Sequence, residues 1–347
     1  MTLERSQAGD IVVTIPHRDD RPYNPIRTHL YTPDELMQEW DGRRQSLDQS
    51  IGTYYDHEGG QVPHAPEEAL CQRIHDDYID RLVLDFIKGS DEDRPKPRKL
   101  IGIMGGHVED RTSRYYSMVA QIAYQLTLAG YCILTGGGPG VMEAGNLGAY
   151  MSGYTPEDLE AALARLRTAP SYPKRDTSDP TNEAKRRNYI EAASEVRRRF
   201  SKGGKSLGVP TWAYPDEPTG QFATHIAKYF ANSIREDGLL AIAAYGVIFA
   251  PGAAGTAQEI FQDAVHNSYL SFNSRGPMVF LGTEVYRRSP SLYDVVLAAA
   301  NRDGYSDFLA LLDDASSVTA FIQKHPPYIK QGAPRTVGLS GDAYPME

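Results

Sequence analysis

Three apolar segments of this chain are each followed at once by a glycine-rich turn and then by a helical pattern. The segments are Lys99 to Met104 before Gly105-Gly106-His107, Tyr131 to Thr135 before Gly136-Gly137-Gly138-Pro139-Gly140, and Leu239 to Ile248 before Pro251-Gly252-Ala253-Ala254-Gly255. Strands and helices that alternate in this way build a parallel sheet with helices on both faces. We therefore expect an α/β fold, a Rossmann-like doubly wound parallel sheet. Its ligand should bind beyond the carboxyl ends of the strands, where the glycine turns lie.

The turn at Pro251 has the composition of an anion site. A buried strand that leads through small residues into a helix leaves backbone N–H groups unpaired, beside the positive end of the helix dipole. Two glycines let an anion approach the main chain, and Thr256 can add a hydroxyl donor. We expect a phosphate here, with the Glu259 carboxylate one turn into the helix beside it. The predicted phosphate-binding residues are Gly252, Ala253, Ala254, Gly255 and Thr256.

Further segments flank and interrupt the strand–turn–helix pattern. Before it lie two helical patterns, one after Pro33 and one after Pro66, and the second carries an apolar stripe that packs either on the main core or on a second subunit. The stripe consists of Leu70, Ile74, Tyr78, Leu82 and Phe86. Residues 89–97 are charged and broken by prolines, which predicts a linker. Residues 153–205, with a basic helix at 185–199, predict a helical insertion.

Length and composition indicate one large domain with additions. With 347 residues, of which 41% are hydrophobic, the chain can bury a full core. We expect a helical extension over residues 1–95, a Rossmann-like catalytic domain over 96–330 and a tail over 331–347. The net charge of −9 argues against nucleic acid or an anionic membrane as a partner, and favours small ligands.

The cysteines and the apolar runs point to a cytoplasmic protein. Cys71 and Cys132 are too few for a disulfide framework, and Cys132 lies in an apolar run where a buried, inert thiol is expected. Residues 1–20 contain no segment of signal-peptide type. The longest apolar run, Leu239 to Ala250, is shorter than the roughly 20 residues that a membrane helix needs.

Several familiar site motifs are missing from the sequence. Neither glycine turn completes G-x-G-x-x-G, and no G-x-x-x-x-G-K-[ST] occurs, so a dinucleotide fingerprint and a triphosphate P-loop are unsupported. The nine histidines show no metal-binding spacing, and we predict no metal. Two Ser/Thr-x-x-Glu patterns, at Ser233 and Thr256, can be simple capping boxes. On that reading Arg235 is a solvated surface residue and Glu259 only caps its own helix.

Taken together, the motifs resemble those of the LOG-type nucleotide phosphoribohydrolases, a family formerly labelled lysine decarboxylases. That family pairs a turn of the form GGGxxG(L/V)M with a later P-G-G-x-G-T-x-x-E, and here these motifs begin at Gly136 and at Pro251. The G-P-G-x-M-E-A form and the Gly-Gly-His after the first strand make the chain most similar to the bacterial nucleotide 5′-monophosphate nucleosidases. The resemblance covers roughly residues 99–285.

The resemblance implies hydrolysis of the N-glycosidic bond of a nucleoside 5′-monophosphate, without a dissociable cofactor. It places the catalytic residues at Glu259 and Arg235. It also implies a homodimer or homotetramer with its site near the subunit contact. The basic helix at 185–199 is typical of a solvated face; the resemblance adds the alternative that it binds a nucleotide effector. The neighbouring turns would line the ribose and base pocket. These residues are Gly105, Gly106, His107, Gly136, Gly137, Gly138, Gly140, Met142 and Glu143.

One departure from the family pattern and two rival functions remain. Ala253 replaces the second glycine of P-G-G, which crowds the turn wherever a positive φ is required. This favours tuned affinity or, as the main alternative, a nucleotide-binding sensor that has lost hydrolysis. A pyridoxal-phosphate decarboxylase is disfavoured because neither motif contains a lysine for the Schiff base.

Overall fold

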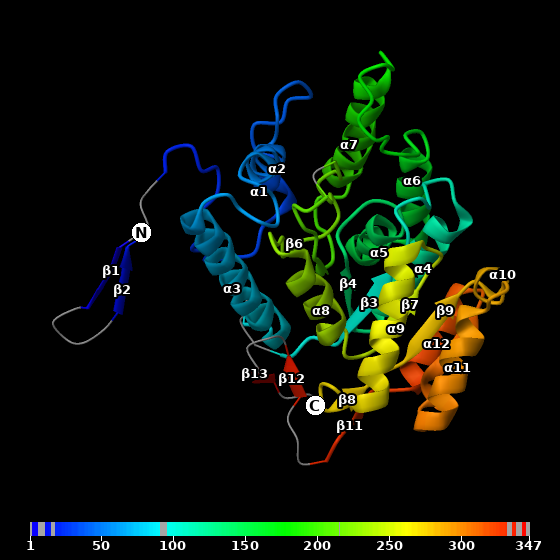
Figure 1. Ribbon diagram of the computed structural model, residues 1–347. Coiled ribbons are helices and arrows are strands. Elements are labelled where there is room, and N and C mark those ends of the chain that lie inside the picture. The colour runs from blue at the N-terminus through cyan, green and yellow to red at the C-terminus, as the bar shows by residue number, and fades with distance from the viewer. Residues whose placement is uncertain are drawn as a thin grey trace.

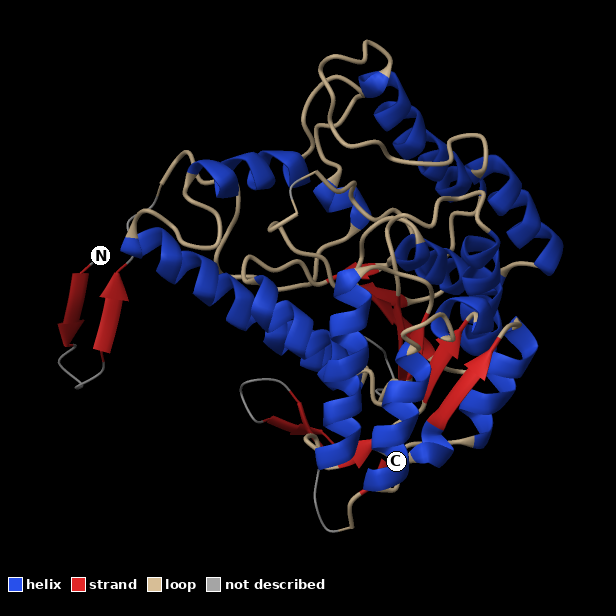
Figure 2. Ribbon diagram, turned by 45° about the vertical axis from the view of Figure 1, so that its right-hand side comes forward, coloured by secondary structure: helices blue, strands red, loops and turns tan. Residues whose placement is uncertain are grey.

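A seven-stranded parallel sheet forms the centre of the computed structural model, which describes residues 18–90, 96–214 and 216–331 and four short strands nearer the ends (Figure 2). The order across the sheet is β10-β9-β7-β3-β4-β5-β6, and all six pairings are parallel. The strands are β3 (Leu100–Met104), β4 (Cys132–Thr135), β5 (Ser206–Gly208), β6 (His225–Ile226), β7 (Val247–Phe249), β9 (Met278–Leu281) and β10 (Leu309–Leu312). The predicted Rossmann-like α/β fold is confirmed.

The direction of the chain through the sheet reverses between β3 and β7. From β3 it passes through α4 (Arg114–Leu128) to the neighbouring β4 and continues outward to β6. It then returns through α8 (Asn232–Ile242) to β7 on the other side of β3. A crevice opens at such a reversal because the two connections leave in opposite directions, and ligands of open α/β sheets bind there.

Helices cover both faces of the sheet (Figure 1). Successive strand residues point to opposite faces, and the residues on both faces are apolar. Ile101 and Ile103 of β3 pack on one face, and Leu100 and Met104 on the other. The first face is covered by α4, α5 (Val141–Tyr150), α6 (Pro156–Leu166), α7 (Asn182–Arg199) and α12 (Ala315–Lys324). The second is covered by α3 (Pro66–Lys88), α8, α9 (Ala254–Tyr269) and α11 (Leu292–Asp303).

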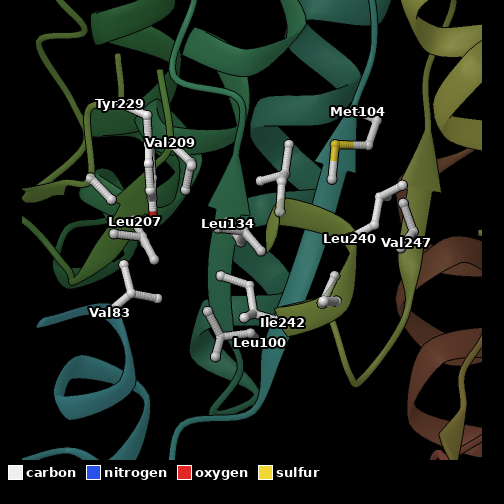
Figure 3. Close-up of a cluster of buried hydrophobic side chains, with 14 of the residues drawn as sticks. Val83, Leu100, Met104, Leu134, Leu207, Val209, Tyr229, Leu240, Ile242 and Val247 are labelled. Atoms are coloured by element: carbon white, nitrogen blue, oxygen red, sulfur yellow. The ribbon is translucent and has the colours of Figure 1, made fainter. Parts of the chain in front are cut away.

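Helix α3 of the N-terminal extension packs on the main core. Val83 belongs to the same apolar cluster as Leu134 and Leu207 of the sheet (Figure 3). The buried face of α3 is shifted from the predicted stripe, of which only Phe86 is fully buried. The buried positions are Glu68, Cys71, Gln72, His75, Asp76, Ile79, Val83, Leu84, Phe86 and Ile87. Of the predicted stripe, Phe86 is buried in the main core and Leu82 packs against it, while the other three residues are half-buried, so the predicted face lies at the edge of the observed one.

Outside the central sheet, the described part of the chain also contains three further α-helices and three two-stranded sheets. The extension contains α1 (Pro33–Leu36) and α2 (Leu47–His57), and α10 (Thr283–Tyr286) follows β9. Two small antiparallel sheets pair β8 (Ser274–Arg275) with β11 (Tyr328–Ile329), and β12 (Arg335–Val337) with β13 (Asp342–Tyr344). A third pairs β1 (Thr2–Arg5) with β2 (Ile11–Thr14).

Two expected elements differ from the structure. The apolar run Leu239 to Ile248 is not one strand: its first part ends α8, and β7 begins only at Val247, after Gly246 turns the chain at a φ of 130°. The centre of the predicted linker, residues 91–95, lies outside the described residues, as does much of the tail. Cys132 is a buried thiol outside any disulfide, as predicted. Among the described residues, none of the helices combines the length and hydrophobicity needed to cross a bilayer.

Candidate functional site

The three glycine turns meet main chain to main chain at the carboxyl ends of β3, β4 and β7. The Gly106 N–H donates to the Pro251 carbonyl at 2.9 Å, and the Gly106 carbonyl accepts from the Val141 N–H at 3.3 Å. A Cβ on Gly106 would lie 3.0 Å from the Gly252 Cα, and one on Gly140, at a φ of 72°, only 2.7 Å from the Gly106 oxygen. Glycine is therefore a steric requirement of this junction, because a side chain would push the turns apart.

A cavity of about 290 Å³ opens at this junction, beyond the carboxyl ends of β3, β4 and β7. The predicted site residues that line it are Gly105, Gly106, His107, Gly136, Met142, Arg235, Ala253, Gly255, Thr256 and Glu259. The predicted residues that do not line it are Gly137, Gly138, Gly140, Glu143, Gly252 and Ala254. Four of these six are glycines that shape the turns rather than the cavity wall.

Helix α9 opens directly onto the cavity with its first N–H groups uncapped. It begins at Ala254, with Ala253 as N-cap and no side-chain cap, so the predicted Thr256 capping box is wrong. The helix starts earlier than the sequence pattern indicated, and Glu259 lies in its second turn rather than its first. A Cβ on Gly255 would meet nothing within 4 Å, which leaves space for a ligand against the main chain. Such a helix start attracts anions.

The alanine at position 253 does not strain the turn. Its φ of −104° is accessible to any L-residue, so the second glycine of the family motif is not needed for a positive φ here. Gly252 is the position that requires glycine, because a Cβ there would lie 2.0 Å from the Thr256 Oγ1. The departure from P-G-G thus leaves the backbone of the turn intact.

Glu259 presents a carboxylate to the cavity that no described residue binds. Among the described residues its side chain makes neither a hydrogen bond nor an ion pair, so the cap role is excluded. Burial raises the pKa of Glu259 to about 7; Arg235 opposes this shift and the nearby Glu236 adds to it. A carboxyl group tuned to this range can take up or release a proton at neutral pH.

Arg235 is buried in the cavity wall, 7% exposed, and is not a solvated surface residue. Its Nη2 donates to the Asn232 Oδ1 at 2.8 Å, while its Nε is buried without a partner among the described residues. The Arg235 Nη1 would lie 3.7 Å from a Cβ on Gly136. Because glycine has no side chain there, this side of the guanidinium stays open. The unused donors are available to an anionic or oxygen-rich ligand.

The residues immediately before helix α8, which carries Arg235, are held by the N-terminal extension. The predicted Ser233 capping box is wrong, because α8 begins at Asn232 and its N-cap, Ala231, offers no side-chain bond. Instead the Asp76 carboxylate of α3 accepts from the Phe230 N–H at 3.0 Å and the Ala231 N–H at 2.9 Å. Sequence spacing cannot predict these hydrogen bonds, because the partners lie more than 150 residues apart in the chain.

Glu143 does not face the ligand space, contrary to the prediction. Arg111 binds both of its oxygens, at 2.6 and 2.9 Å, and the hydroxyls of Tyr116 and Tyr189 donate to it at 2.7 and 2.9 Å. Arg111 in turn donates to the carbonyl oxygens of Ala169 and Tyr189 at 3.1 Å each. This buried network joins the insertion to helix α5, and its fully occupied carboxylate cannot bind a ligand.

The sequence pattern missed the residues of a loop between β5 and β6. Thr211, Tyr214 and Glu217 line the cavity, as do Val108 and Glu236 from other segments. The loop holds no motif, and only its contacts with distant segments place it. Arg186 of the insertion binds Asp216 at 2.9 Å. No group of three or more His, Cys, Asp or Glu side chains in the described part of the chain is arranged to hold a metal ion.

The contacts of the same loop with the extension centre on Asp48 of α2. Its carboxylate accepts from the Trp212 Nε1 at 2.9 Å, from the Thr219 Oγ1 at 2.6 Å and from the Lys228 Nζ at 2.8 Å. Asp48 is 5% exposed, so these bonds are shielded from water. The extension and the insertion thus hold this cavity wall from both sides.

No protein-family model and no curated protein matches the chain. Solved structures that resemble it include the molybdenum cofactor carrier protein from Chlamydomonas reinhardtii, with 16% identity, a TM-score of 0.38 and coverage of 65% of this chain and 98% of that one. The molybdenum cofactor binding protein from the phototrophic bacterium Rippkaea orientalis has 13% identity, a TM-score of 0.38 and coverage of 67% and 98%. Likenesses of this size decide nothing about the ligand, and the fold assignment rests on the strand order itself.

Proposed function

We propose that this protein hydrolyses the N-glycosidic bond of nucleoside 5′-monophosphates to a free base and ribose 5-phosphate. One observation carries the proposal: the unbound Glu259 carboxylate and the buried Arg235 guanidinium share one cavity with the uncapped start of α9. The motif resemblance at Gly136 and Pro251 points to the same reaction. The cavity of about 290 Å³ is of the size of small-molecule sites.

The phosphate would bind at the start of α9. The N–H groups of Ala254, Gly255 and Thr256 are free of side-chain caps, and the helix dipole favours a negative charge at this end. Gly255 lets the phosphate oxygens come close to the main chain. Arg235 would add charge-assisted donors from the opposite wall. Binding the phosphate, which does not react, orients the sugar for the chemical step.

Glu259 would act on the sugar. As the C–N bond breaks, positive charge develops on the ribose, and a fixed carboxylate beside it stabilises the transition state. The carboxylate accepts a proton from the attacking water, the water oxygen bonds to C1′, and the base leaves with the electron pair of the broken bond and takes up a proton. A pKa of about 7 suits a general base at neutral pH.

The assay for this proposal is release of free base from AMP, GMP, IMP, CMP and UMP. The Glu259→Gln variant should release base at least about 100-fold more slowly, because general-base catalysis contributes on the order of 10² to 10⁴. The matched control is Glu191→Gln, which removes one carboxylate from the exposed face of α7 and should leave the rate unchanged. Nucleotide binding without base release from the parent protein would instead support a sensor or a carrier.

Exposed apolar side chains on α9 support the expectation of a homodimer or homotetramer. Phe261, Val265 and Tyr269 recur every four residues and are 42%, 49% and 80% exposed. Apolar side chains aligned on one helix face are typical of association surfaces. Light scattering on the parent protein should give the mass of a dimer or tetramer; a monomeric mass at micromolar concentration would contradict this expectation.

A nucleotide effector at the basic helix remains part of the proposal. Arg197 of α7 pairs with Asp34 at 2.9 Å, which leaves Arg198 and Arg199 as the more exposed cations of the last turn. If replacing all three arginines by alanine changes neither the affinity nor the effect of any nucleotide, the effector idea is wrong.

A further inference from the structure

Glu217 is a second carboxylate in the cavity that the proposed reaction does not use. It comes from the loop between β5 and β6 and lies against the turn that follows β4. A Cβ on Gly138 would be 3.0 Å from its Oε2 and 2.7 Å from the Met142 Cε. Within the described residues the Glu217 side chain makes no hydrogen bond and no ion pair. Burying a carboxylate without hydrogen-bond donors raises the free energy of the folded protein. A ligand that supplies such donors would remove this penalty.

Glu217 and Glu259 stand at different turns around the cavity. Glu217 lies against the turn after β4 and Glu259 is on α9 after β7, and β3 separates these two strands in the sheet. Burial raises the pKa of Glu217, and the positive charges of Lys228, Arg235 and His107 oppose this shift. A nucleotide with its phosphate at α9 and its sugar at Glu259 would therefore extend its base toward Glu217.

We propose that Glu217 binds the base of the nucleotide and selects guanine. An ionised carboxylate only accepts hydrogen bonds, and its two oxygens match two adjacent N–H donors. Guanine presents such a pair at N1–H and N2–H₂, whereas adenine and cytosine place an acceptor beside their amino group and hypoxanthine lacks the amino group. The inference rests on the proposed function for the position of the nucleotide, but concerns recognition rather than cleavage.

The contacts that hold the β5–β6 loop in place suit a role of Glu217 in selecting the base. Trp212 and Thr219, on either side of Glu217, both donate to Asp48 of the extension, and Asp216 binds Arg186 of the insertion. Specificity requires a fixed geometry, because a loop that adapts to each base discriminates little. Contacts on both sides hold the loop in place, with its carboxylate directed at the cavity.

The test compares the five nucleoside monophosphates with parent and Glu217→Gln proteins. The parent should have its highest kcat/KM with GMP. In the variant, kcat/KM for GMP should fall by about 10-fold to 100-fold, as expected for loss of a bidentate base contact. The value for AMP should rise, since the glutamine amide accepts from N6–H₂ and donates to N1. The control Glu191→Gln removes a carboxylate from the exposed face of α7, away from the cavity, and should not change the GMP-to-AMP ratio.

Two further measurements separate this inference from the proposed function. Calorimetric binding of GMP and AMP to a Glu259→Gln protein, with and without Glu217→Gln, reads the base preference without turnover. If no nucleotide is cleaved but GMP binding still depends on Glu217, the hydrolase proposal fails and the recognition proposal stands. If base is released with no GMP preference, or if Glu217→Gln lowers kcat/KM equally for all five substrates, Glu217 does not select the base and the inference is overturned. Should Glu217→Gln fail to fold, Glu217→Asp keeps the charge and should retain the GMP preference at lower affinity.

Discussion

The raised pKa of Glu259 makes the candidate catalytic residue a source of instability above neutral pH. Burial raises this pKa from 4.5 to about 7, so the folded protein retains a proton that the unfolded chain releases between these values. Stability therefore falls as the pH rises through this window. Above it, the difference between the two pKa values corresponds to about 3 kcal/mol in favour of the unfolded state.

The Glu259→Gln variant should remove this penalty, because an amide of the same shape carries no charge to bury. Relative to the parent, its free energy of unfolding should be about 1 kcal/mol higher at pH 5 and about 3 kcal/mol higher at pH 8.5. Guanidinium unfolding followed by the fluorescence of the buried Trp212 measures both values, in buffers free of phosphate so that no anion occupies the site. The same substitution that should slow the proposed base release would thus stabilise the protein.

The control for this experiment is Glu191→Gln on the exposed face of α7, which changes the net charge equally. It should give no difference that grows with pH. The reasoning is refuted if the Glu259→Gln difference is the same at both pH values, or if that variant is the less stable protein at pH 8.5. Either result would mean that water or an unrecognised donor already satisfies the carboxylate in the folded state.

Four further substitutions test the framework around the site. Asp76→Ala removes the acceptor that holds the two residues before α8, and should lower stability by about 1 kcal/mol and raise the KM for nucleotide, measured by thermal unfolding and base release. Gly252→Ala places a Cβ 2.0 Å from a neighbouring hydroxyl and should abolish nucleotide binding in calorimetry. Gly255→Ala adds a Cβ with nothing within 4 Å, so it should preserve the fold and weaken phosphate binding only. Arg111→Ala leaves the Glu143 carboxylate buried and uncompensated, which should cost about 3 to 5 kcal/mol in denaturant unfolding.

Matched controls separate these effects from general damage. Asp77→Ala changes an exposed neighbour on α3, and Arg114→Ala breaks an exposed ion pair, which is worth at most about 1 kcal/mol. If Asp76→Ala behaves like Asp77→Ala, the Asp76 hydrogen bonds do not position α8. If Arg111→Ala is as mild as Arg114→Ala, the buried network is not structural. Gly255→Ala binding as tightly as the parent would place the phosphate elsewhere.

The sheet and the cavity could be predicted from the sequence because both follow from local patterns. Apolar runs followed by glycine turns at Gly105, Gly136 and Pro251 specify parallel strands whose ends meet, and they brought Glu259 and Arg235 into one cavity as expected. The proline and small residues after β7 also indicated a helix start that is open to an anion. The assignment of roles to Glu259 and Arg235 remains a prediction.

The wall of the cavity formed by the β5–β6 loop could not be predicted, because its position depends on distant partners. Glu217 has no motif around it, and its loop is held by Asp48 and Arg186. The error at Glu143 has a similar origin: the motif placed it beside the turn, but Arg111 and two tyrosines occupy its carboxylate. Neither set of long-range contacts has a signature in sequence spacing.

The direct main-chain contact between the turns after β3, β4 and β7 limits how such a site can diversify. At Gly106 and Gly140 even one methyl group would collide with the facing backbone, so this end of the cavity cannot be remodelled by side-chain replacement. The loop between β5 and β6 also touches the Gly137 turn at Pro210 and Gly220, but the segment of it that carries Glu217 is placed by side chains of the two peripheral segments. New ligand preferences would therefore arise by exchange of that loop and its supports, while the anion-binding floor is inherited unchanged.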